Sequence, residues 1–143
     1  MKKIFKGLFI FLFLVLLSGC AKDYKAITST KFIETLKNEG YLVNTHTPIY
    51  DSNTEESISA SGKNTQFLFF VYDSEKDAKK YVANTYKKAE GYSYKEYDNY
   101  IIVKNTKNGY FYLVQVDKTV ISANSDLKSS KKEINNIFKK LGY

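Results

Sequence analysis

The feature that most restricts the fold is a series of apolar segments of strand length in the second half of the 143-residue chain. Three residue pairs separate these segments: Asp98-Asn99, Asn108-Gly109 and Asp117-Lys118. Such pairs are typical of tight hairpin turns, which join antiparallel neighbours. They predict a four-stranded antiparallel meander over residues 92–97, 100–105, 110–116 and 119–123.

Helices are expected before, between and after the strands. The helical spacing of apolar residues predicts them over residues 29–39, from Ser74 to about residue 89, and over residues 126–141. The segment QFLFFVY at residues 66–72 is apolar on both faces, as in a central strand, and residues 57–61 fit a short edge strand. We therefore expect an α+β fold, in which about three helices cover one face of an antiparallel sheet.

The amino terminus has the order of a secretory signal. Three lysines within residues 1–6 precede an uninterrupted apolar run over residues 8–17, and Ser18, Gly19 and Cys20 follow. The run is about half the length of ~20 residues that a membrane-spanning helix needs, so cleavage is favoured over a permanent span.

The sequence Leu17-Ser18-Gly19-Cys20 resembles the lipobox of bacterial lipoproteins. The resemblance implies that Leu17, Ser18 and Gly19 are recognised by signal peptidase II, and that the Cys20 thiol receives a diacylglyceryl group. A thiol is required because sulfur is the nucleophile. Two acyl chains exceed what stable membrane attachment requires. The expected location is the extracytoplasmic face of the cell membrane.

The chain then divides into three parts: a signal peptide at residues 1–19, a lipidated tether at residues 20–28, and one α+β domain at residues 29–143. The pattern of the carboxy-terminal third, from Tyr110 to Tyr143, is similar to that of small uncharacterised lipoproteins of Gram-positive bacteria. This resemblance implies a location and a fold type. It transfers no activity and no residue role.

Composition argues against most enzyme chemistries, because the chain has one Cys, one His and no Arg or Trp. A lone His46 does not make a zinc site, and no nucleophile elbow is present. Asp51, Asn53 and Glu55 have the alternate spacing of a calcium loop, but Glu56 stands where the loop needs Gly and Gly62 where it needs Glu. We expect no enzyme activity, no metal and no cofactor.

Tyrosines are dense on the predicted meander, and they are the candidate ligand contacts: Tyr92, Tyr94, Tyr97, Tyr100, Tyr110 and Tyr112. Strand propensity alone would also produce this pattern, with half of the rings in the core. Lysine pairs at 79/80, 87/88, 131/132 and 139/140 suggest a basic helical surface. They are more simply explained as a solvated face.

Two functional hypotheses follow. The first is a non-enzymatic interaction module at the cell envelope, anchored through acyl chains on Cys20, that contacts an envelope protein or glycan. The alternative is a binding module for a small ligand, a glycan or a peptide, that uses exposed tyrosines on the sheet. Nucleic acid is not expected as a partner of an exported domain without arginine. A concave, tyrosine-lined cleft would favour the alternative.

Overall fold

The computed structural model describes residues 22–45 and 52–143. The elements follow in this order: α2 (Ser29–Asn38), β1 (Leu42–Asn44), β2 (Thr54–Ser61), β3 (Gln66–Tyr72), α3 (Glu75–Tyr86), β4 (Ser93–Glu96), β5 (Tyr100–Asn105), β6 (Tyr110–Val116), β7 (Thr119–Ser125), the short 3-10 helix η1 (Lys128–Ser130) and α4 (Lys131–Leu141). Within those ranges, every helix falls short of the length and hydropathy needed to cross a bilayer. The predicted lipobox, from Leu17 to Cys20, lies outside the described residues.

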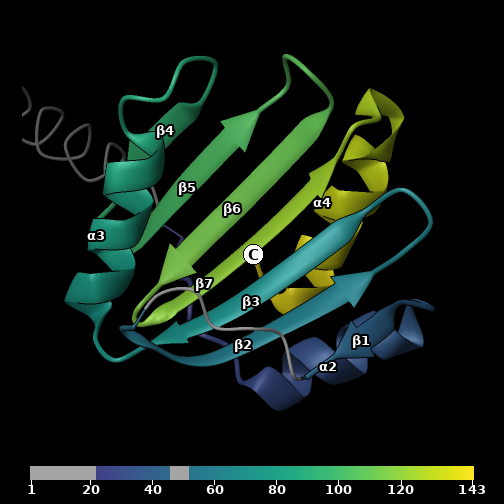
Figure 1. Cartoon of the computed structure of the whole chain (residues 1–143), viewed down its shortest axis with the longest axis horizontal. Coiled ribbons are helices and arrows are strands. Elements are labelled where there is room, and N and C mark those ends of the chain that lie inside the picture. The colour runs from purple at the N-terminus through teal and green to yellow at the C-terminus, as the bar shows by residue number, and fades with distance from the viewer. Residues whose placement is uncertain (1–21, 46–51) are drawn as a thin grey trace, which may run out of the picture.

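The strands form one open antiparallel sheet with the order β1-β2-β3-β7-β6-β5-β4 (Figure 1). Strands β4, β5, β6 and β7 pair in chain order, and β7 then pairs with β3 in the middle of the sheet. The α+β class is therefore confirmed. Residues 57–61 were expected at a sheet edge, but β2 pairs with both β1 and β3, and the three-residue β1 forms that edge.

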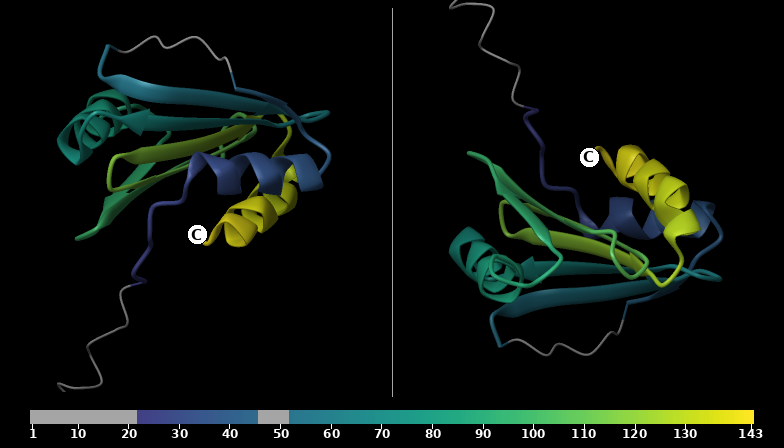
Figure 2. Two further views of the ribbon diagram at one scale, coloured as in Figure 1. Left: turned by 90° about the horizontal axis from the view of Figure 1, so that it is seen from below. Right: turned by 90° about the horizontal axis from the view of Figure 1, so that it is seen from above.

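Helices lie on both faces of the sheet (Figure 2). On one face, α2 and α4 enclose the larger core, in which Phe32 and Phe138 pack against Phe67 and Phe69 of β3. On the opposite face, Ala78 and Val82 of α3 pack against a smaller core that includes Leu113.

The expectation that the helices cover one face is wrong. The physical reason lies in β3, whose side chains are apolar on both sides: Phe67 and Phe69 point toward α2 and α4, whereas Tyr72 points toward α3. Because α2 and α4 already fill one face, the second apolar face of β3 is buried only if α3 lies on the other side.

Local signals set the helix ends as the sequence predicted. The Ser74 hydroxyl accepts a hydrogen bond of 3.1 Å from the backbone N–H of Asp77 at the start of α3. At the end of α4, Gly142 adopts a left-handed conformation with φ of 111°, and its N–H bonds the carbonyls of Phe138 and Lys139.

Residues 22–28, predicted as part of a tether, lie against the domain, and we call this segment the strap. The Tyr24 ring contacts the rings of Tyr100 and Tyr143, with centroid distances of 4.6 and 5.4 Å. The Asn99 amide donates hydrogen bonds to the Asp23 carboxylate at 2.8 Å and to the Tyr24 carbonyl at 2.9 Å. The strap is thereby held at the turn between β4 and β5.

Candidate functional site

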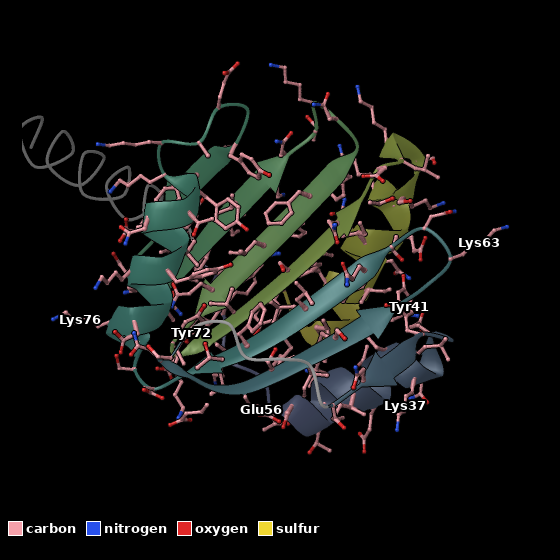
Figure 3. The ribbon with its side chains drawn as sticks, in the orientation of Figure 1. Lys37, Tyr41, Glu56, Lys63, Tyr72 and Lys76 are labelled. Atoms are coloured by element: carbon pink, nitrogen blue, oxygen red, sulfur yellow. The ribbon has the colours of Figure 1, made fainter. Side chains whose placement is uncertain are left out.

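A cleft of about 540 Å³ opens on the face of the sheet that carries α3. It exists because α3 covers only part of this face and leaves the carboxyl end of β7 and the amino ends of β3 and β6 beside it (Figure 3). Its volume lies within the range of about 300–1,000 Å³ that is usual for small-molecule sites.

The floor of the cleft follows from strand register. Gln66 of β3 pairs with Asn124 of β7, and Leu68 pairs with Ser122 in the next row. Directly paired residues project from the same face of a sheet. The floor therefore alternates amide and hydroxyl groups with apolar surface, which Leu68 and Phe70 supply.

One wall of the cleft is aromatic. The ring centroids of Tyr86, Tyr92 and Phe111 lie 5.1, 5.3 and 5.5 Å apart, so each ring contacts the other two. Tyr86 comes from α3, Tyr92 from the loop before β4, and Phe111 from β6. All three are half-buried, which leaves part of each ring at the surface of the cleft. Tyr81 extends this wall along α3.

The environment of Tyr86 favours its neutral form. Burial, followed by the neighbouring hydroxyls of Tyr81 and Tyr92, raises the pKa of Tyr86 above its ordinary value. Tyr86 therefore offers the cleft a ring face and a neutral hydroxyl group.

The remaining lining is polar and almost uncharged. Asn105 and Asn108 stand at the end nearest the turn between β5 and β6, and Asp126 is the single charged residue among the described residues that line the cleft. The Asn105 side-chain oxygen accepts a hydrogen bond of 2.8 Å from the backbone N–H of Lys107, which fixes the orientation of its amide.

A second hollow of about 460 Å³ continues the cleft toward the turn between β2 and β3. The two hollows share Gln66, Asn124, Ser125 and Asp126. Together they form one groove that runs from the aromatic wall across the end of β7 to the loop around Lys63. We call this combined feature the groove.

The six predicted tyrosines do not share one surface. Tyr92 lies in the aromatic wall, whereas Tyr94 packs beneath α3, where burial and then the Glu96 carboxylate raise its pKa to about 12. Tyr100, Tyr110 and Tyr112 belong to the buried core on the opposite face, and of these only Tyr110 also lines the cleft. Tyr97 is 40% exposed on the turn after β4, away from the groove.

Sequence reasoning missed several residues of the site: Phe70, Tyr81, Tyr86, Phe111, Gln66 and Asn124. Tyr81 and Tyr86 belong to the apolar stripe of the helix predicted from Ser74 to about residue 89. Their positions at the edges of that stripe are a signal that could have shown them, since edge positions are only half-buried when a helix packs on a sheet.

The residues that were considered as zinc or calcium ligands lie in loops that are partly outside the described residues. His46 and Asp51 lie there, and Glu55 forms an ion pair of 2.8 Å with Lys118. Among the residues that the structure describes, none of the groupings of His, Cys, Asp and Glu has the size needed to hold a metal ion.

Comparisons with known proteins return no match, whether to protein-family models, to curated proteins or to solved structures.

Proposed function

We propose that this protein is a non-enzymatic binding module, held at the extracytoplasmic face of the cell membrane by acyl chains on Cys20, that binds a ligand of the cell envelope in the groove. The observation that carries the proposal is the combination of an open aromatic wall with a floor of side-chain amides and hydroxyls. Such a lining buries apolar surface and orients polar groups of a ligand at the same time.

The concave shape favours a ligand site over a flat contact surface. Helix α3 forms one side of the cleft, and the turn between β5 and β6 together with the segment around Asp126 borders one end. The three half-buried rings are rigid, so they can contact a ligand with little loss of side-chain freedom. The polar groups beside them can adapt their hydrogen bonds to the ligand.

The anchor is supported by the sequence alone. The apolar run at residues 8–17 and Leu17-Ser18-Gly19-Cys20 resemble a lipoprotein signal. In the proposed mature protein, the membrane is a partner through the lipid, and the groove serves a second partner.

Photo-crosslinking in intact cells tests the groove. A benzophenone amino acid at Asn124, which lines both hollows, should capture a ligand, because the excited ketone inserts into nearby C–H bonds. The same group at Asn38 is the control, since Asn38 is exposed at the end of α2 on the other face. A product from Asn124 that is absent from Asn38 supports the proposal, and identical patterns from both positions contradict it.

A further inference from the structure

We propose that the ligand of the groove is a neutral glycan, an uncharged chain of pyranose rings whose first ring packs against Tyr86, Tyr92 and Phe111. This inference rests on the proposed function and specifies its ligand.

The lining offers the two kinds of surface that a pyranose ring needs. The C–H face of such a ring is apolar and packs on aromatic side chains, and the three rings of the wall supply that surface. Its hydroxyl groups both donate and accept hydrogen bonds. Side-chain amides and hydroxyls do the same, and Gln66, Asn124 and Ser122 place them beside the wall.

The low charge of the groove is the second observation. Charged residues make up 26% of the chain. Yet the polar side chains that the paired residues of β2, β3 and β7 direct to the face of α3 are all neutral: Thr54, Ser57, Ser59, Ser61, Gln66, Ser122 and Asn124. Within the described ranges, Lys63 and Asp126 are the charged residues that line the groove, and their charges are opposite. An anionic polymer would need a cationic lining, so a neutral ligand is favoured.

The third observation distinguishes a glycan from a peptide. Extended peptides are commonly held by backbone hydrogen bonds to the open edge of a sheet. The strands beneath the cleft, β3, β7 and β6, each have a neighbour on both sides. Their backbone groups are used in the ladder, so the ligand is recognised by side chains, as the hydroxyl groups of a glycan would be.

The length of the groove indicates more than one ring. The second hollow continues past Gln66 and Asn124 to the loop around Lys63 and Asn64. The ligand would therefore be an oligosaccharide, or a segment of a longer glycan chain, with its hydroxyl groups on the amides of the floor.

The absence of Trp from the chain allows a direct test. Tyr92→Trp places a single fluorophore in the aromatic wall and keeps a stacking ring there. The full-length lipoprotein in phosphatidylcholine vesicles is titrated with the neutral oligosaccharides chitotetraose, cellotetraose and maltotetraose. A saturable change in emission with at least one of them is expected. Tyr97→Trp, on the exposed turn away from the groove, is the matched control and should not respond.

A second variant tests the floor. In the Tyr92→Trp background, Asn124→Asp adds a charge without a change of size and should weaken binding about tenfold. Asn38→Asp on α2 is the isosteric control and should leave binding unchanged.

No response to any of the three oligosaccharides would overturn the glycan assignment, as would saturable binding of a neutral peptide or of polyphosphate alone. If the Asn124 crosslinker still captures a molecule in cells, the binding function stands and only the ligand class fails.

Discussion

The ring of Tyr24 packs against the ring of Tyr100, with 4.6 Å between their centroids and an angle of 60° between their planes. Tyr24 belongs to the strap, whereas Tyr100 begins β5 and is 5% exposed in the core. The Tyr143 hydroxyl adds a hydrogen bond of 3.1 Å to the Lys25 carbonyl. The strap is thus joined to the sheet and to the carboxy terminus by contacts on both sides.

Removing the Asn99 amide should release the strap. Asn99→Ala eliminates both hydrogen bonds to Asp23 and Tyr24, and we expect the free energy of unfolding to fall by about 1 kcal/mol. Cleavage by trypsin after Lys22 and Lys25 should become faster. Asp98→Ala, which changes the exposed residue directly before Asn99, is the control. Equal cleavage rates in the two variants would contradict the role of the Asn99 contacts.

The proposed lipid anchor would depend on the sulfur atom of Cys20. In cells, Cys20→Ala should move the protein from the detergent phase to the aqueous phase of a phase-partition experiment, because alanine accepts no diacylglyceryl group. Serine at the same position should behave as alanine does. A processed Cys20→Ala protein that still partitions into detergent would disprove lipidation at this residue.

Stability should decline at alkaline pH through Tyr41. Its hydroxyl bonds Thr65 at 2.5 Å and also bonds the Glu133 carboxylate. Burial first, and then the bond to Glu133, raise the pKa of Tyr41 from 10.0 to about 12. Between these values the unfolded chain loses a proton that the folded chain keeps, so the free energy of unfolding falls as pH rises.

Urea unfolding of Tyr41→Phe at a series of alkaline pH values measures this contribution. The variant should be less stable than the parent at neutral pH, and its stability should fall less steeply from pH 10 to 12. A Tyr41→Phe slope equal to that of the parent would show that other groups cause the alkaline decline.

Gly109 should tolerate no side chain. It has φ of +101°, and a Cβ atom there would lie 2.1 Å from the backbone oxygen of Ser125. Gly109→Ala should lower the free energy of unfolding by about 3 kcal/mol, because the neighbouring atom is backbone and cannot move aside.

Gly40 provides the matched comparison. Its φ of +83° is also left-handed, but a Cβ atom there would meet nothing within 4 Å. Gly40→Ala should therefore cost only the backbone strain, about 1 kcal/mol. Urea denaturation of both variants gives the difference, and equal costs would contradict the close approach at Gly109.

Local signals in the sequence predicted most of the elements. Turn dipeptides placed the strand boundaries near Asn99, Asn108 and Asp117, and Ser74 and Gly142 marked helix ends that the structure confirms. These features depend on residues close in the chain, so they can be read without knowledge of the fold. The last helix is an exception, because α4 begins at Lys131 and Leu127 is 46% exposed before it.

The side of the sheet on which each helix lies could not be predicted. It depends on the pairing of β3 with β7, which joins segments about 50 residues apart, and no local signal specifies such a pairing. The dependence on long-range pairing also explains why the predicted tyrosines could not be assigned to one surface. Tyr112 belongs to β6, where strand register directs it to the opposite core, whereas Tyr92 lies in the loop before β4 and reaches the groove.

The site could be predicted only in part, because most of its residues are brought together by segments that are distant in the chain. Gln66 and Asn124 form the middle of the groove because β3 and β7 are neighbours in the sheet, although each looks like an ordinary strand-end residue. Tyr92 was recognised because tyrosines are dense around it. Its partners Tyr86 and Phe111 come from other elements and meet it only in the folded chain.

The docked strap and the aromatic wall of the groove lie at opposite ends of the strands. Asn99, which holds the strap, lies at the turn between β4 and β5, whereas Phe111 of the aromatic wall lies near the other end of β6. Seven residues of β6 separate these ends by roughly 20 Å. The four Cα–Cα steps from Cys20 to Tyr24 reach at most about 14 Å. A lipid on Cys20 would therefore keep the strap end of the sheet close to the bilayer, and the groove would lie at the far end of the strands.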